Sequence, residues 1–391
     1  MLHISRAPLS FLKTLNTQPM FINDLKQSSS SMKKVNQFVL VKKIGSGSTS
    51  KVYVAKDTIS NHFLACKVFH LSRYRHSAFV DRLEREIRIM RILNNHSSII
   101  SLNDVLYSQE NDTAYMFMEL ADCGSLEKSI QNENYLKFSD EDLSSIFKQV
   151  VEGLIHLHSL GIVHHDVKPA NIMLFSDGSA KLADFDVGHS FESCDDVVGS
   201  PAYQAPEIFN DIPLNDDSDD RTDQIFESDD SADDSYENDP SKEDVWSLGV
   251  SLYEAAFGRL PFGGYNMYEV NNEIHMTKNI VFDSYAHRSD DLIDLIRKML
   301  VVDNKSRISM EEVRNHPFFA RAPKKAHIPV PQIDFDNTDI ENSDFNYVSA
   351  TICDENFSFA RNAAQKTIFA NSFYTGSPSL NEDVLNDECE I

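Results

Sequence analysis

The chain has 391 residues, 41% of them hydrophobic, and a formal net charge of −25 at pH 7. This length and apolar content allow a sizeable buried core, whereas the strong negative charge argues against general nucleic-acid binding, which requires a basic face. The five cysteines are scattered without close pairs, and no apolar run is long enough to cross a bilayer. We therefore expect no disulfide framework, no zinc site and no membrane span, and a cytoplasmic location with the nucleus as the alternative.

The negative charge is unevenly distributed along the chain. Residues 211–239 contain thirteen Asp or Glu against one Arg, so this segment repels itself and has too little apolar surface to fold. We expect it to be a disordered acidic insert. Residues 321–391 are also acidic and are expected to form a mostly disordered tail, and residues 1–36 a flexible extension. The folded unit is therefore predicted over 37–320.

The first half of this unit has the pattern of an antiparallel sheet. Residues 38–44 and 51–55 are rich in apolar and β-branched side chains and flank a cluster of Gly, Ser and Thr. Residues 63–69 and 114–119 are short apolar runs, and both patterns are typical of strands. One helix is expected among these strands, over residues 77–93.

The second half is predicted to be helical. Ser139, followed three residues later by Asp142, has the spacing of a helix start and opens an amphipathic segment that stops near Gly161. Further helices are expected over 245–257 and 290–300. The sequence therefore predicts an α+β protein with a small β-rich lobe, a larger α-rich lobe and a cleft between them.

Features of the β-rich half are suited to holding a phosphate group. Residues 45–52, Gly-Ser-Gly-Ser-Thr-Ser-Lys-Val, form a turn between two predicted strands, where small residues let the backbone approach a phosphate closely. Taken alone, such a turn is equally typical of an ordinary hairpin. Lys67 is a charged residue inside an apolar strand, and by itself it could equally reach solvent from a sheet edge. Glu86 on the following helix offers it a partner.

The strongest motif is His-His-Asp-Val-Lys-Pro-Ala-Asn at residues 164–171, followed by Asp-Phe-Asp at 184–186. Carboxylates and an amide in this register can orient a hydroxyl group and supply oxygen ligands for Mg²⁺. An isolated Asp of this kind would be an ordinary turn residue. Here the set is followed in order by Ala-Pro-Glu at 205–207, Asp-Val-Trp-Ser-Leu-Gly at 244–249 and Arg307, which makes a chance match negligible.

Together these motifs resemble those of the eukaryotic protein kinases, and the resemblance covers residues 37–320. It implies the bilobal protein kinase fold, with one main helix in an antiparallel N-terminal lobe and a mostly helical C-terminal lobe. The dipeptide Lys168-Pro169 is similar to the serine/threonine type rather than the tyrosine type. The implied activity is transfer of the γ-phosphoryl group of ATP to a Ser or Thr hydroxyl of another protein in intracellular signalling, with Mg²⁺ or Mn²⁺ as the metal.

The resemblance also implies catalytic roles for individual residues. Lys67 would contact the α- and β-phosphates, and Glu86 would be its ion-pair partner. Asp166 would be the catalytic base, with Lys168 near the γ-phosphate. A stack of buried residues that reports the active state would consist of Met90, Leu102, His164 and Phe185.

Further residues are implied to bind the metal and the nucleotide. Asn171 and Asp184 would hold Mg²⁺, whereas Glu207 and Arg307 would form a structural ion pair that ties the activation segment to the large lobe. The phosphate-covering loop and the residue before it would be Ile44, Gly45, Ser46, Gly47 and Ser48. Val52, Ala65 and Met173 would surround the adenine, with Met118 as the gatekeeper and Glu119 and Ala121 in the hinge.

The activation segment has a narrower resemblance. Residues 199–208, Gly-Ser-Pro-Ala-Tyr-Gln-Ala-Pro-Glu-Ile, are similar to those of the liver-kinase-B and calmodulin-kinase-kinase group of upstream kinases. This implies a protein substrate that can itself be a kinase, and an activating partner protein. A generic calmodulin-dependent-kinase-like enzyme would show much the same large lobe, but no basic amphipathic helix suited to calmodulin follows Phe319.

Three residues depart from the kinase pattern. Ser50 replaces the third loop glycine, Asp186 replaces the glycine after Asp-Phe, and His165 replaces an arginine that in many kinases pairs with a phosphate on the activation segment. Asp186 is the most serious departure, because a second carboxylate adds like charge where glycine would be conformationally free. It keeps open the alternatives of a pseudokinase or a weakly active nucleotide-binding scaffold. A third alternative is that the insert and tail carry the function on a kinase platform.

Overall fold

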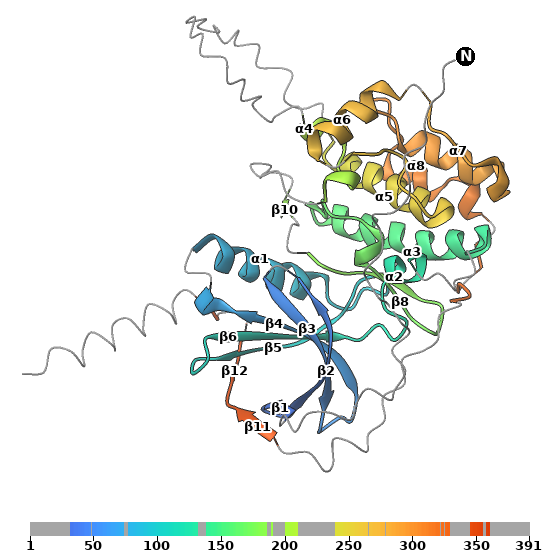
Figure 1. Ribbon diagram of the computed structural model, residues 1–391. Helices are drawn as coiled ribbons and strands as arrows, with labels where there is room; N and C mark the ends of the chain where they lie inside the picture. Colours follow the sequence, from blue (N-terminus) through green and yellow to red (C-terminus); the bar gives the residue numbers. More distant parts are fainter. Residues whose placement is uncertain are drawn as a thin grey trace, which may run out of the picture.

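The computed structural model of the chain describes residues 32–47, 49–73, 77–131, 138–185, 189–190, 200–209, 239–264, 266–277, 279–320, 322–323, 325–328, 345–354 and 357–359. These residues form a strand-rich lobe and a helical lobe, which lie one above the other in Figure 1. This is the bilobal α+β architecture that the sequence predicts.

The small lobe is built on an eight-stranded sheet in the order β11-β1-β2-β3-β4-β6-β5-β12. Its strands are β1 (Met32–Val35), β2 (Phe38–Ser46), β3 (Ser50–Asp57), β4 (Phe63–His70), β5 (Leu102–Ser108), β6 (Thr113–Glu119), β11 (Phe345–Val348) and β12 (Thr351–Ile352). The predicted strands pair antiparallel with their neighbours. Their inward side chains form a buried cluster in which the rings of Phe38 and Phe117 stack at 3.9 Å.

Helix α1 (Ser77–Leu93) lies on the side of this sheet that faces the large lobe (Figure 1). Its bounds agree with the helix predicted over 77–93. Leu83, Ile87, Met90 and Leu93 recur at helical spacing and are each at most 5% exposed. This apolar face fixes the helix against the core and leaves its polar residues to make specific contacts.

Three strands of the sheet come from outside the folded unit predicted over 37–320. β1 lies in the predicted N-terminal extension, and β11 and β12 lie in the predicted acidic tail. β11 runs parallel to β1, and β12 runs antiparallel to β5, so the tail supplies both outermost strands. Phe-Asn-Tyr-Val and Thr-Ile are too short to show a strand pattern in the sequence. The predicted insert over 211–239 lies outside the described residues except for Asp239.

The large lobe is mostly helical, as predicted. Its helices are α2 (Leu126–Ile130), α3 (Asp140–Ser159), α4 (Pro206–Phe209), α5 (Ser241–Phe257), α6 (Met267–Met276), α7 (Asp290–Met299) and α8 (Met310–Arg314), and its short strands are β7 (Ile162–Val163), β8 (Ile172–Leu174), β9 (Ala180–Leu182) and β10 (His189–Ser190). Short 3-10 helices in this lobe occupy Pro169–Asn171, Pro201–Tyr203, Ser284–Ala286 and Pro317–Phe319, and one in the small lobe, Leu71–Arg73, lies between β4 and α1.

The longest helix of this lobe, α3, begins where the sequence predicts. The hydroxyl of Ser139 accepts the backbone N–H of Asp142 at 3.1 Å and caps the helix. The helix ends at Ser159, shortly before Gly161, whose φ of 69° lies in the left-handed region. None of the helices in the described part of the chain is both long and apolar enough for a membrane span.

Candidate active site

Lys67 lies on β4 and reaches two carboxylates. Its Nζ is 2.8 Å from Oε1 of Glu86 on α1 and 2.8 Å from Oδ1 of Asp184, which follows β9. Burial by itself would lower the pKa of Lys67, but the charges of Glu86 and Asp184 outweigh it and hold the pKa above its usual value. The lysine is therefore a stable cation at neutral pH, as a phosphate-binding group must be. The pairing of Lys67 with Glu86 is the predicted one.

Asp184 is held in an unusual backbone conformation. Its φ of 68° lies in the left-handed region, which non-glycine residues seldom adopt. The positive charge of Lys67 holds the pKa of Asp184 below its usual range although burial opposes this shift. A backbone constraint of this kind is typical of functional sites, where the surrounding structure fixes a side chain in place.

The residue after Asp184 completes the predicted stack of core residues. Phe185 is fully buried, and its ring centroid lies 5.1 Å from that of His164. Met90 and Leu102 belong to the same buried cluster as Phe185. Of the predicted stack, the structure thus shows the contact between His164 and Phe185 and places Met90 and Leu102 in the same buried core as Phe185.

The carboxylate of Asp166 is held through both of its oxygens. Lys168 donates from Nζ to Oδ2 of Asp166 at 2.6 Å, and Asn171 donates from Nδ2 to the same oxygen at 2.9 Å. Oδ1 accepts the backbone N–H of Ser200 at 3.2 Å. Lys168 also donates to the hydroxyl of Ser200 at 2.7 Å, so the loop carrying the predicted base is tied directly to the activation segment.

Asn171 and Asp184 fit the predicted role of metal ligands. Asn171 uses its amide nitrogen to donate to the main-chain and side-chain oxygens of Asp166, which leaves its own side-chain oxygen for a metal. Asp184 remains ionised because of its low pKa. The described residues contain no group of three or more His, Cys, Asp or Glu suited to a metal, so the remaining ligands would be phosphate oxygens and water, which Mg²⁺ commonly uses.

Asp244, at the start of α5, orders the loop that carries Asp166. Its fully buried carboxylate accepts the backbone N–H groups of His164 and His165, each at 2.9 Å, and lies 2.8 Å from Nε2 of His158. Burial by itself would raise the pKa of Asp244, but the hydrogen bond with His158 and the nearby histidines hold it below its usual range. Asp244 lies in a predicted motif without a predicted role, because its partners are about 80 residues away in the sequence.

His165 contacts α5. Its Nδ1 lies 2.9 Å from Oε2 of Glu243, and its φ of 61° lies in the left-handed region. Burial by itself would lower the pKa of His165, but the hydrogen bond with Glu243 and the charges of Asp244 and Glu243 raise it above its usual value. Asp186 and residues 191–199 of the activation segment lie outside the described residues.

The residues predicted around the adenine come from both lobes. Val52 lies on β3, Ala65 on β4, Met118 near the end of β6 and Met173 on β8, and all four side chains are partly exposed. Ala121 follows β6 and is mostly buried. Three of these residues lie on strands of the small-lobe sheet and Met173 lies on a strand of the large lobe, and their role at an adenine ring stays a prediction.

The predicted hinge and phosphate-covering loop are adjacent to this set. The side chain of Glu119 accepts from Nζ of Lys181 at 2.7 Å, and its backbone N–H donates to the main-chain oxygen of Ser101 at 3.0 Å. Residues 44–46 form the end of β2, and the N–H of Gly47 donates to the main-chain oxygen of Ser50 at 2.9 Å. Ser48 lies outside the described residues.

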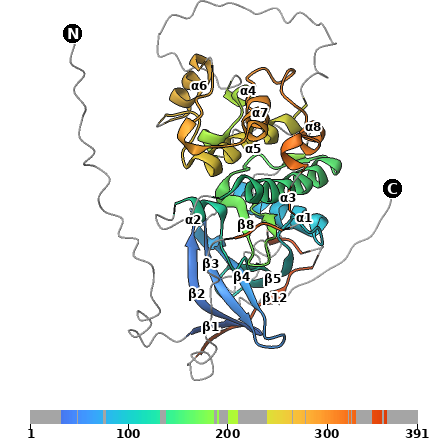
Figure 2. The ribbon, with the colours of Figure 1, turned by 90° about the vertical axis from the view of Figure 1, so that its right-hand side faces the viewer.

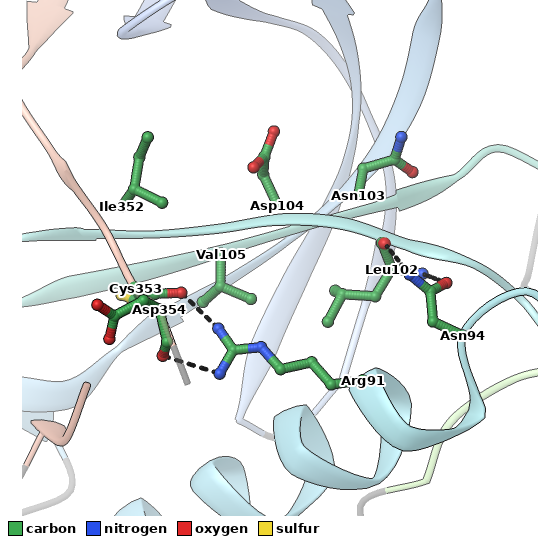
Figure 3. Close-up of a pocket in the computed structure, with 9 residues that line it drawn as sticks. All are labelled: Arg91, Asn94, Leu102, Asn103, Asp104, Val105, Ile352, Cys353 and Asp354. Carbon is green, nitrogen blue, oxygen red and sulfur yellow. Dashed lines mark hydrogen bonds between the residues drawn. The ribbon is translucent and has the colours of Figure 1, made fainter. Parts of the chain in front are cut away.

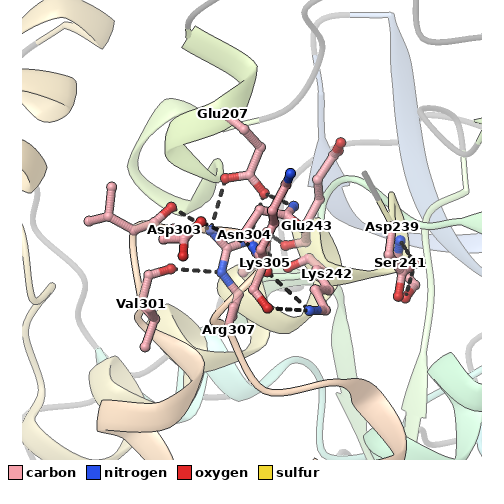
Figure 4. Close-up of polar contacts among 12 residues, drawn as sticks. Glu207, Asp239, Ser241, Lys242, Glu243, Val301, Asp303, Asn304, Lys305 and Arg307 are labelled. Atoms are coloured by element: carbon pink, nitrogen blue, oxygen red, sulfur yellow. Dashed lines mark hydrogen bonds and ion pairs between the residues drawn. The ribbon is translucent and has the colours of Figure 1, made fainter. Parts of the chain in front are cut away.

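Glu207 and Arg307 form the predicted structural ion pair. The guanidinium donates from Nη1 to Oε1 of Glu207 at 2.7 Å and from Nη2 to Oε2 at 2.8 Å, as Figure 4 shows. Nδ2 of Asn304 donates to Oε1 of the same carboxylate at 2.8 Å, and the side chain of Arg307 is fully buried. The pair links α4, at the end of the activation segment, to the region between α7 and α8.

Comparison with known proteins points to one family. The family model described as protein kinase domain matches residues 38–319. The serine/threonine-protein kinase STK11 of Homo sapiens is 31% identical over 309 residues, which cover 76% of this chain and 64% of the relative. The corresponding stk11 of Xenopus laevis is 32% identical with 76% and 65% covered, and the serine/threonine protein kinase OSK3 of Oryza sativa subsp. indica is 31% identical with 76% and 53% covered. The chain thus spans between about half and two thirds of the length of these relatives.

Proposed function

The chain belongs to the protein kinase family, and on that basis we propose that it transfers the γ-phosphoryl group of ATP to serine or threonine hydroxyls of other proteins. The observation that carries the proposal is that Lys67 lies 2.8 Å from both Glu86 and Asp184. Phosphoryl transfer depends mainly on positioning and charge stabilisation, so the lysine and the metal ligand must be assembled at the same time. In this chain the lysine and the proposed metal ligand Asp184 contact each other directly.

Each of these residues has a distinct task in the transfer. Lys67 would hold the α- and β-phosphates, because it is a buried cation whose orientation is fixed by Glu86. Asp166 would accept a hydrogen bond from the attacking hydroxyl and orient it, and Lys168 would neutralise charge near the γ-phosphate. Mg²⁺ or Mn²⁺ bound to Asn171 and Asp184 would supply a Lewis acid that neutralises the phosphates.

A pseudokinase is the competing function, and the assembled site weighs against it. A scaffold has no need for the lysine contacts described above or for an Asp166 carboxylate that is held through both oxygens. Such fixed polar networks are typical of a site that must be oriented in advance of a reaction. The relatives named serine/threonine kinases support the same choice.

The regulatory setting of the chain is also a proposal. The likeness of the activation segment to upstream kinases supports a kinase as the protein substrate and an activating partner protein. We place the enzyme in the cytoplasm or nucleus, in accord with the free Cys66, Cys123 and Cys353 of the described part of the chain.

The test is phosphoryl transfer from γ-labelled ATP to a generic protein substrate, followed by phosphoamino-acid analysis. Wild type should label serine or threonine, and Asp184→Ala should lower ADP production about a hundredfold or more, because the metal loses a ligand. Asp291→Ala, which changes an exposed carboxylate on α7, is the matched control and should keep the wild-type rate. Absence of turnover in wild type, or equal turnover in Asp184→Ala, would contradict the proposal.

A further inference from the structure

Tail residues 345–354 and 357–359, here called the tail clamp, join the two edges of the small-lobe sheet. β11 pairs with β1, and β12 pairs with β5 at the other end of the strand order, although only two residues separate β11 from β12. Asn36 in the β1–β2 turn donates to the main-chain oxygen of Ala350 at 2.9 Å and accepts its N–H at 3.1 Å. The tail clamp therefore pairs with both ends of the strand order, and the side chain of Asn36 holds the connection between β11 and β12.

The tail clamp then contacts α1 with a second set of hydrogen bonds. The guanidinium of Arg91 donates to the main-chain oxygens of Cys353 and Asp354, at 2.9 Å for the latter (Figure 3). The N–H of Phe359 donates to Oε1 of Glu84 at 2.7 Å. Glu84 and Arg91 are seven residues apart and therefore lie on one face of the helix, which the tail clamp contacts at two points.

Apolar packing reinforces these contacts. The rings of Phe357 and Phe359 lie 5.6 and 5.5 Å from the ring of Tyr107 on β5 and 5.1 Å from each other. Phe359 is 3% exposed, and Cys353 is 5% exposed and donates its N–H to the main-chain oxygen of Val105 at 2.8 Å. Aromatic pairs at these distances are favourable beyond the area they bury. The tail clamp is thus part of the core beside α1.

The junction between Arg91 and the tail clamp is open on one side. A cavity of about 540 Å³ lies beside it, and its lining includes Arg91, Leu102 and Cys353 (Figure 3). Leu102 belongs to the same large buried cluster as Phe185. At this end of the helix, Met90 and Leu93 are buried on the core side, so the hydrogen bonds of Arg91 to the tail hold the side of the helix that faces the cavity.

We propose that the tail clamp fixes α1 in the position at which Glu86 reaches Lys67, and that Arg91 is a positioning residue for phosphoryl transfer. Glu86 holds α1 from the sheet side, and the tail clamp holds the same helix through Glu84 and Arg91. Because Arg91 donates to main-chain oxygens, the contact depends on the path of the tail and not on its side chains. This proposal deepens the proposed function and rests on it.

The experiment uses Arg91→Ala in the full chain, with Arg88→Ala as the matched control because Arg88 is exposed on the same helix. Arg91→Ala should raise hydrogen exchange of the α1 amides while leaving α3 unchanged, and should lower kcat/KM about tenfold. Arg91→Lys should restore part of the loss, because a lysine can still donate to one carbonyl. In a Glu86→Gln background, Arg91→Ala should cost less than about twofold, because the contact that it supports is already weakened.

Two results would overturn the proposal. One is that α1 exchange and kcat/KM in Arg91→Ala match those in Arg88→Ala. The other is that Arg91→Ala costs the same factor in the Glu86→Gln background as in wild type, which would mean that its effect does not pass through Glu86. If wild type itself transfers no phosphoryl group, the proposed function fails, and the exchange of α1 in Arg91→Ala still decides whether the tail clamp holds the helix.

Discussion

Asp244 illustrates how one buried carboxylate orders the loop that carries Asp166. It accepts two successive backbone N–H groups, from His164 and His165, and contacts His158. A buried charge is tolerated only when hydrogen bonds replace its lost hydration, and here the donors come from the loop itself. The hydrogen bonds that stabilise the charge of Asp244 therefore also fix the backbone just before Asp166, the next residue of the loop.

His165 should make stability depend on pH. Its raised pKa means that the folded state binds the proton more tightly than the unfolded state, whose histidine pKa is about 6.5. The stabilisation is fully present below that unfolded value and is lost as pH rises through the folded value. We expect the free energy of unfolding of wild type to exceed that of His165→Gln by more at about pH 6 than at about pH 9.

Chemical denaturation of both proteins at the two pH values checks this prediction. Gln cannot titrate, and every other group is shared, so the comparison isolates the histidine beside Glu243 and Asp244. A difference that stayed constant, or that grew at the higher pH, would mean that the folded protein does not favour the protonated ring.

The sequence points to candidate site residues more readily than to their supports. Lys67, Asp166, Asn171 and Asp184 stand in short motifs, so the order of residues along the chain is enough to propose them. The contact between His165 and Glu243 joins residues 78 positions apart and exists only because α5 packs beneath the loop. Such contacts arise only when the chain has folded, and no short sequence pattern around either residue predicts them.

At the scale of elements, two arginine pairs with similar geometry differ in burial. Arg307 binds Glu207 through two hydrogen bonds and has a fully buried side chain. Arg314 on α8 binds Glu152 on α3 through two hydrogen bonds at 2.9 and 3.0 Å, but its side chain is 43% exposed. Solvent screens the second pair and not the first.

Arg307→Met should therefore destabilise the protein far more than Arg314→Met. The first substitution leaves Glu207 without its main partner and should cost about 3 to 5 kcal/mol of unfolding free energy. The second should cost less than about 1 kcal/mol. Denaturant unfolding of the two variants provides the measurement. If both variants lost similar amounts of unfolding free energy, burial would not explain the difference expected between the two ion pairs.

The long elements of the fold are predictable, and the short ones are not. α1 and α3 have enough helical repeats, and α3 a clear cap at Ser139, for their bounds to follow from the sequence. β11 and β12 have four and two residues and pair with strands about 240 to 310 positions away. Two to four residues cannot establish a period, so only the assembled sheet shows that they are strands.

At the scale of the whole molecule, the tail contacts both lobes. Ala326 is buried beside Gly178, whose φ is 85°, and the N–H of His327 donates to Oδ1 of Asp142 at the start of α3. Residues 345–354 and 357–359 lie on the small lobe, where β12 is labelled beside β5 in Figure 2. The described parts of the tail thus contact the large lobe near Asp142 and the small lobe at both ends of its sheet.

The acidic insert should be dispensable for folding. Replacement of residues 211–238 by a short Gly-Ser linker keeps Asp239, whose carboxylate accepts from the N–H and hydroxyl of Ser241 at the start of α5. Long surface loops cost little in closure entropy, so Tm should change by less than about 3 °C and basal activity should stay near that of wild type. A large fall in Tm on calorimetry would show that the insert packs on the core.

The central claim is that Asp166 and Lys67 carry out phosphoryl transfer, and single-turnover transfer from γ-labelled ATP tests it most directly. Asp166→Asn removes the group that orients the hydroxyl, and Lys67→Met removes the cation that holds the phosphates. Each should lower the transfer rate about a hundredfold or more while the circular dichroism spectrum remains that of wild type. Transfer by Asp166→Asn at a rate near that of wild type would contradict the account.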